Sequence, residues 1–137
     1  MKKLFLLLSI SILSLLPLSA QQNYGIKHSN PMPNLIRVVV ANAELLNVNK
    51  SQMQEIMTWR KANKPTMKKM VQDVVREERA LKESALSTGK DLKKTADSII
   101  KNRANIISIK IACRANLQRI LTPKQFEQLL TIYKSVL

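Results

Sequence analysis

A regular seven-residue spacing of apolar side chains in the second half of the chain limits the fold more than any other feature. Intervals of seven separate Leu92, Ile99, Ile106, Cys113 and Ile120. A heptad repeat over about four heptads places these side chains on one stripe of a long helix that packs along another helix. We therefore predict a helix from Lys90 to Ile120, about 46 Å long at 1.5 Å per residue. Ile100, Ile107 and Leu117 are expected to widen its apolar stripe.

The partner of this helix is expected just before it in the chain. Apolar residues recur at helical spacing between residues 49 and 86, and Asn49 with Gln52 three residues later forms a capping box at the start. Pro65 should kink or break this helix, because proline lacks a backbone donor and clashes with the preceding turn. The glycine of Ser87–Gly89 can end a helix, so this segment predicts the reversal of an elongated helical hairpin.

Two short helices complete the predicted fold. A first helix is expected from Asn34 to about Asn47, and a closing helix begins where Thr122 is the N-cap, Pro123 takes the first position and Gln125 closes a capping box. The apolar positions of the first helix are Leu35, Val38, Val39, Leu45 and Leu46. With few glycines and prolines, the chain is predicted to be all-α, with four helices in a single domain over residues 34–137.

The first twenty residues resemble an export signal. Lys2 and Lys3 precede an apolar run, and Leu18–Ala20 offers a small-residue cleavage site. The run is shorter than the roughly 20 residues that a spanning helix needs, and no later segment approaches that length, so we expect no membrane span. Residues 21–33 are polar and contain glycine and proline, which predicts a flexible arm. We expect a periplasmic protein once residues 1–20 are removed.

The charge of the chain limits its partners. Lys and Arg number 23 against 9 Asp and Glu, a formal net charge of +14. In a cytosolic protein such a charge would point to nucleic acid, but export argues against that partner. Anionic envelope surfaces and acidic segments of other proteins remain as candidate partners. With one His and one Cys, the chain is poorly supplied for a zinc site or a His-centred triad, so we expect no enzyme, no metal site and no cofactor.

The two capping boxes are copies of one short pattern. Residues 121–125 read LTPKQ, which matches LTxxQ, and residues 48–52 read VNKSQ, a degenerate copy. The motif residues are Val48, Asn49, Gln52, Leu121, Thr122 and Gln125. Two copies flanking a helical hairpin, behind an export signal, resemble the LTxxQ family of small exported proteins. That family includes Spy- and CpxP-like periplasmic chaperones and, more distantly, CnrX- and ZraP-like metal-responsive proteins. The resemblance covers most of residues 35–137.

The resemblance implies an antiparallel homodimer that forms a thin, curved cradle. Its concave side would hold unfolded or partly folded client proteins without ATP, and some family members also bind the sensor domain of an envelope-stress kinase. The residues are compatible with this, because a short chain with few aromatic side chains gains by burying surface in a partner. We therefore expect an exported, ATP-independent chaperone or envelope-stress adaptor.

Basic residues of the two long helices are the candidate client contacts. The helix predicted from Lys90 to Ile120 carries only two acidic residues, Asp91 and Asp97, so its positive charge exceeds what solubility requires. The simpler interpretation is a solvated face. The candidates are Arg60, Lys61, Lys64, Lys101, Arg103, Lys110 and Arg114.

Three further interpretations stay open. A metal-binding regulator of the same fold could use His28 or pairs of methionines one turn apart, although that spacing equally indicates a core face. A structural envelope protein would bind anionic lipid or polysaccharide through its charge. Cys113 is expected as a buried small hydrophobe, with an intersubunit disulfide as the alternative. The methionine pairs are Met53 with Met57 and Met67 with Met70.

Overall fold

The computed structural model describes residues 32–135 and places four helices and no strand in that range. The helices are α2 (Leu35–Ala41), α3 (Lys50–Ala85), α4 (Leu92–Ile120) and α5 (Pro123–Lys134). The all-α prediction is confirmed. The export signal predicted for residues 1–20 and residues 21–31 of the predicted arm lie outside the described residues. Among helices α2 to α5, none combines the length and the apolar character needed to cross a bilayer.

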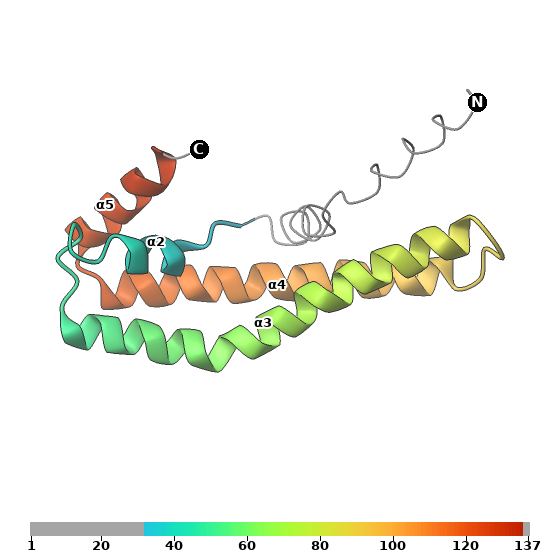
Figure 1. Cartoon of the computed structure of the whole chain (residues 1–137), viewed down its shortest axis with the longest axis horizontal. Helices are drawn as coiled ribbons and strands as arrows, with labels where there is room; N and C mark the ends of the chain where they lie inside the picture. Colours follow the sequence, from blue (N-terminus) through green and yellow to red (C-terminus); the bar gives the residue numbers. More distant parts are fainter. Residues whose placement is uncertain (1–31, 136–137) are drawn as a thin grey trace, which may run out of the picture.

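The two long helices form the body of the molecule. Helices α3 and α4 run antiparallel side by side, while α2 and α5 pack at the open end of this hairpin (Figure 1). The 29 residues of α4 span about 43 Å at 1.5 Å per residue. At the closed end, Gly89 adopts a φ of +66° and its N–H donates to the carbonyl of Ser84 at 2.8 Å. The chain therefore reverses at the predicted position.

Apolar side chains bury themselves in two separate clusters. The end core holds ten buried residues from all four helices and their connections, including Val39, Ile56, Leu117 and Leu129. The hairpin core holds Val71, Val74, Ile99 and Ile106, all from α3 and α4. The predicted heptad stripe of α4 supplies both cores, since Ile99 and Ile106 enter the hairpin core and Cys113 enters the end core. Most of the hairpin is thus only two helices thick.

The first helix is shorter than the sequence predicts. It ends at Ala41 rather than near Asn47, and Asn42 is its C-cap. The side-chain Nδ2 of Asn42 donates to the carbonyl of Val38 (2.8 Å), and its backbone N–H is shared between the carbonyls of Val38 (3.1 Å) and Val39 (3.2 Å). Asparagine competes in this way with helical hydrogen bonds. In the turns that follow, Leu46 is buried and Leu45 is 66% exposed, so Leu45 does not share the apolar face expected of it.

Pro65 bends α3 without ending it. The helix is continuous from Lys50 to Ala85, and Figure 1 shows a change of direction near its middle. Proline removes one backbone donor, which weakens the helix locally. Two residues before the proline, Asn63 Nδ2 donates to the carbonyl of Trp59 at 2.9 Å. Of the two outcomes predicted for Pro65, the kink is the one observed.

The apolar stripe of α4 is narrower than predicted. Leu117 is fully buried, but Ile100 is 65% exposed and does not join the stripe as expected. Along most of the hairpin α4 has one neighbouring helix, so only one side of it can be covered. The side chains on the opposite side of α4 remain in contact with solvent.

Candidate functional site

Both copies of the short motif begin a helix with a capping box. Asn49 Oδ1 accepts from the backbone N–H of Gln52 at 2.9 Å, and Gln52 Oε1 accepts from the N–H of Asn49 at 3.0 Å. In the second copy, Thr122 Oγ1 accepts from the N–H of Gln125 at 3.2 Å, and Gln125 Oε1 accepts from the N–H of Thr122 at 2.9 Å. These bonds satisfy backbone donors that the first turn of a helix leaves free.

The two motif copies also bind each other through their glutamines. Gln52 Nε2 donates to Gln125 Oε1 at 2.9 Å, and Gln125 Nε2 donates back to Gln52 Oε1 at 3.2 Å. The second hydrogen of each amide reaches a carbonyl of the other segment: Gln52 bonds to Ile120 (3.0 Å), and Gln125 bonds to Leu46 (3.1 Å) and Asn47 (2.9 Å). We call this pair the glutamine clasp. Its amide groups are fully satisfied, as buried polar groups require.

The apolar positions of the motif hold the clasp against the end core. Leu121 is buried in that core, and Val48 packs against it. The motif is therefore structural: it starts two helices and ties α3, the end of α4 and α5 together. The sequence predicts each capping box, but the contact between them was not anticipated. The signal available in the sequence was the identical glutamine at the end of both copies.

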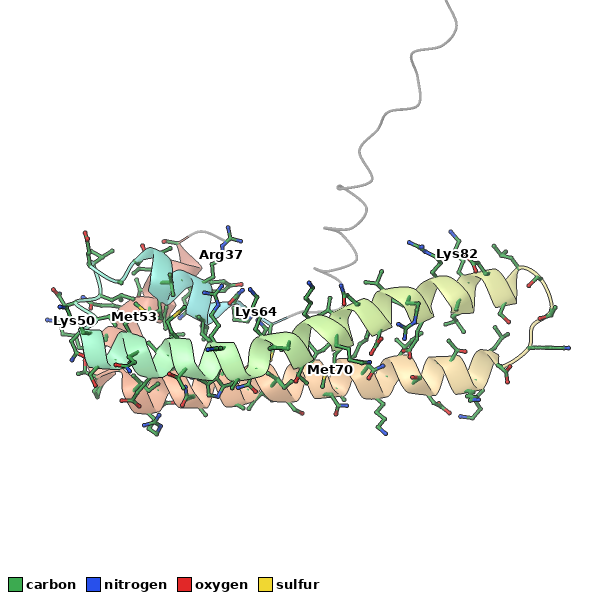
Figure 2. All side chains as sticks on the ribbon, turned by 60° about the horizontal axis from the view of Figure 1, so that its bottom comes forward. Arg37, Lys50, Met53, Lys64, Met70 and Lys82 are labelled. Atoms are coloured by element: carbon green, nitrogen blue, oxygen red, sulfur yellow. The ribbon has the colours of Figure 1, made fainter. Side chains whose placement is uncertain are left out.

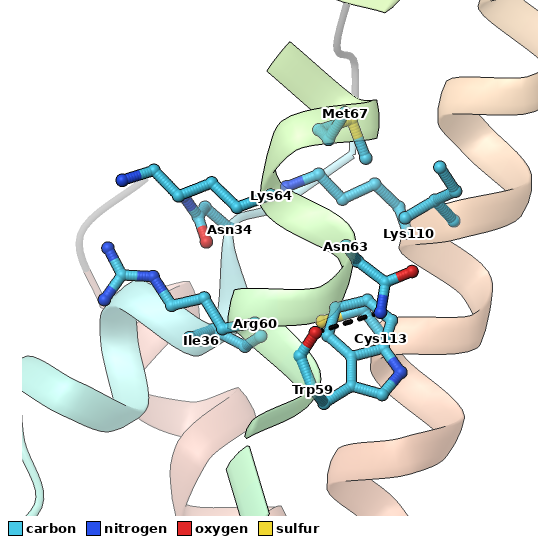
Figure 3. Close-up of a pocket in the computed structure, with 10 residues that line it drawn as sticks. Asn34, Ile36, Trp59, Arg60, Asn63, Lys64, Met67, Lys110 and Cys113 are labelled. Carbon is cyan, nitrogen blue, oxygen red and sulfur yellow. Dashed lines mark hydrogen bonds between the residues drawn. The ribbon is translucent and has the colours of Figure 1, made fainter. Parts of the chain in front are cut away.

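Three of the seven basic candidates gather at one pocket. Arg60 and Lys64 of α3 and Lys110 of α4 line a pocket of about 180 Å³ beside the start of α2 (Figure 3). Its apolar lining includes Trp59 and Cys113. Burial lowers the pKa of the Lys110 ammonium, because a charge removed from water is penalised, and burial likewise raises the pKa of the Cys113 thiol.

The other candidates are placed elsewhere. Arg103 of α4 is half-buried and forms an ion pair with Glu78 of α3. The guanidinium of Arg114 lies 5.1 Å from the centre of the Phe126 ring, a cation–π contact between α4 and α5. Lys61 and Lys101 are exposed. Arg103 and Arg114 thus help to hold helices together.

The middle of the hairpin carries positive charge without acidic neighbours in sequence. No acidic residue lies between Glu55 and Asp73 on α3, or between Asp97 of α4 and Glu127 of α5. These stretches lie against each other in the antiparallel hairpin, where Glu55 and Arg119 form an ion pair at 3.0 Å near the open end. Figure 2 shows the lysines spread along the length of α3. We call this region the basic belt: Arg60, Lys61, Lys64, Lys68, Lys110 and Arg114.

A second apolar stripe of α4 faces solvent. Ile100 and Ile111 are 65% and 56% exposed. With the half-buried Ile107 they follow one another at intervals of seven and four residues, which places them on one helix face. We call these three residues the isoleucine stripe.

Small and basic residues surround the isoleucine stripe on the helix surface. Ala104 and Ala115 share its face. Helical spacing places Arg103, Lys110 and Arg114 along one edge of the stripe and Lys101 on the other side. Helix α4 therefore presents an apolar strip bordered by cations.

The methionine pairs lie mainly in the cores. Met53 packs against the end core, and Met67 and Met70 pack against the hairpin core, where Figure 2 places Met70. Met57 is 38% exposed. Within residues 32–135, no three His, Cys, Asp or Glu side chains gather where they could hold a metal ion, and His28 lies outside that range. These placements agree with the core interpretation of the methionine spacing.

Known proteins give no guide to the role of these features. Comparisons of the chain with protein-family models, with curated proteins and with solved structures gave no match. The function is therefore inferred from the glutamine clasp, the basic belt and the isoleucine stripe themselves.

Proposed function

We propose that this chain is an exported, ATP-independent chaperone or envelope-stress adaptor that binds unfolded or partly folded proteins. The observation that carries the proposal is the isoleucine stripe, an exposed apolar strip on a strongly basic helix. Large apolar side chains that gather on one exposed helix face commonly mark a binding surface. A flat strip without a deep pocket selects apolar segments broadly, which suits a protein that must accept many clients.

The energetics favour weak and reversible binding. Burial of an isoleucine side chain contributes about 1.5–3 kcal/mol when the side chain starts fully exposed, and less when it starts partly covered. Ile100 and Ile111 are each a little over half exposed, so the stripe contributes only a few kcal/mol. Part of that gain is offset by the ordering of the client. Lys101 and Lys110 border the stripe and form no ion pair with an acidic side chain of residues 32–135. They add attraction for acidic client segments, which salt screens over roughly 8 Å at physiological strength.

We also propose that the chain is a member of the LTxxQ family and acts in the periplasm as a homodimer. The glutamine clasp supports the first point, since it gives the two motif copies one shared structural role. The thin hairpin supports the second, because a body two helices thick buries little apolar surface of its own and gains by packing against a second copy. An antiparallel pair of such hairpins would form the cradle that the resemblance implies, with a sensor kinase as a further partner.

An aggregation assay tests the proposal. Light scattering would follow chemically reduced α-lactalbumin with the protein present at near-stoichiometric ratios, at low and at high salt. We expect the chain to suppress aggregation, and salt to weaken the effect. The double variant Ile100→Ser/Ile111→Ser should suppress aggregation several-fold less well.

A matched control separates the stripe from general surface polarity. Leu45 is 66% exposed and lies in the turns before α3, away from the stripe, so Leu45→Ser should retain full activity. Circular dichroism would show that all variants keep their helix content. Failure of the unmodified chain to protect the client at low salt would refute the proposal, as would full activity in the stripe variant.

The basic belt favours one second candidate. A structural protein that binds anionic lipid or polysaccharide would need the same positive charge but no apolar stripe. Cosedimentation with phosphatidylglycerol vesicles, together with no effect on client aggregation, would favour this function over a chaperone.

A further inference from the structure

A small pocket lies within the basic belt, where three helices meet. It opens between the start of α2, the middle of α3 and the second half of α4 (Figure 3). Its apolar lining comes from Ile36, Trp59, Met67, Ile109 and Cys113. The hydrogen bond from Asn63 to the carbonyl of Trp59 lies at the same place, beside the Pro65 bend of α3. The pocket is thus part of the folded core region and distinct from the isoleucine stripe.

The size of the pocket limits what can enter. Its volume is about 180 Å³. An apolar cavity of about 150 Å³ is large enough to bind benzene. The pocket therefore has room for one phenyl ring or one large aliphatic side chain.

The charge at the pocket selects for an anion. Arg60, Lys64 and Lys110 line it, and none of the three forms an ion pair with an acidic side chain of residues 32–135. Figure 3 shows their side chains extending in the same direction. Lys110 is half-buried, and burial lowers the pKa of its ammonium, an effect that the nearby Cys113 thiol partly offsets. A carboxylate placed here would gain more than one that meets fully solvated lysines.

We propose that this pocket is a specificity site for client segments in which one aromatic or large aliphatic side chain stands next to a carboxylate. The inference rests on the proposed chaperone function and narrows its clients. The apolar side chain would fill the space beside Trp59 and Met67, and the carboxylate would meet Lys64 and Lys110. The isoleucine stripe then gives broad affinity, while the pocket distinguishes acidic segments from neutral ones.

Binding of short dye-labelled peptides, measured by fluorescence anisotropy at low salt, tests the inference. The first peptide carries one Phe between two Glu in a Gly-Ser background; the second replaces Phe with Ala, and the third replaces both Glu with Gln. We expect either replacement to weaken binding about tenfold or more, since it removes the buried ring or the charge partner. Phenylacetate, added as a competitor, distinguishes a free aryl carboxylate from a peptide as the source of the ligand.

Charge-matched variants place the binding at the pocket. Lys64→Gln/Lys110→Gln should weaken binding of the Glu-Phe-Glu peptide about tenfold or more. Lys90→Gln/Lys93→Gln removes the same charge at the closed end of the hairpin, away from the pocket, and should bind as the unmodified chain does. Circular dichroism would verify that both double variants are folded.

The outcomes separate this inference from the chaperone proposal. Equal binding of the three peptides, or unchanged binding by the pocket variant, would overturn the inference even if client aggregation is suppressed. Binding of phenylacetate without binding of any peptide would also overturn it. Selective peptide binding that is lost in the pocket variant supports the site, and the aggregation assay then decides the chaperone function independently.

Discussion

Replacement of Gln125 by alanine should destabilise the protein strongly, because this one side chain joins three segments. Its amide donates to Leu46, Asn47 and Gln52, and its Oε1 accepts from Thr122 and Gln52. The residue is 9% exposed, so water can replace few of these partners. The alanine variant would lose one of the two bonds of the second capping box, that from the Thr122 N–H to Gln125 Oε1. It would also leave Gln52 with Ile120 and Asn49 but without its glutamine partner.

The size of the effect follows from the bonds that are lost. Loss of the hydrogen bond from the Thr122 N–H to Gln125 Oε1 costs about 1 kcal/mol, and a buried polar group left without a partner costs about 1–3 kcal/mol. We expect the Gln125→Ala variant to lose about 2–4 kcal/mol of its free energy of unfolding. In a domain of this size, 1 kcal/mol corresponds to about 4–8 °C, so the melting temperature should fall by roughly 10–30 °C.

Urea and thermal unfolding, followed by circular dichroism at constant protein concentration, would measure this loss. Gln128→Ala is the matched control, since Gln128 is an exposed glutamine on the same helix, and it should change stability by no more than about 0.5 kcal/mol. A double-mutant cycle with Gln52→Ala isolates the contact between the two glutamines. We expect a coupling energy of about 1 kcal/mol or more, because each single variant already opens the clasp.

Two results would refute this reasoning. One is a Gln125→Ala variant that is no less stable than Gln128→Ala. The other is additivity of the Gln52→Ala and Gln125→Ala effects within about 0.5 kcal/mol, which would show that the two motif copies stabilise their helices independently.

The remaining predictions concern the hairpin. Ile106 is fully buried and Ile100 is 65% exposed. In urea unfolding, Ile106→Ala should therefore lower the free energy of unfolding by about 2–5 kcal/mol and Ile100→Ala by about 0.5 kcal/mol or less. Equal losses in the two variants would contradict the assigned burial. Pro65→Ala should raise the melting temperature, because proline inside a helix costs up to about 3 kcal/mol, and a lower melting temperature would argue against this. Burial raises the pKa of the Cys113 thiol above its usual 9.0, so at higher pH the unfolded chain loses this proton first and stability falls. Unfolding measured from neutral to alkaline pH should therefore show a smaller decline for Cys113→Ala than for the unmodified chain, and identical curves would contradict the shift.

For the basic candidates, the sequence shows the excess of positive charge but not which residues lie together. The excess of Lys and Arg on the two long helices is visible from composition alone. Which of these residues share a surface depends on the register of α3 against α4, because Arg60 and Lys110 lie far apart in the chain and meet only in the folded hairpin. The ion pair of Arg103 with Glu78 depends on the same register.

The sequence by itself determined the two long helices and the closing one, because their start and stop signals are local. The capping boxes at Asn49 and Thr122, the glycine reversal and the heptad period each act within a few residues of the chain. The tertiary structure alone decided which apolar positions are covered, since burial requires a neighbouring helix. It left Ile100 in solvent while burying Leu117, and it joined Gln52 to Gln125, whose bond forms only when the hairpin brings the start of α3 next to the start of α5.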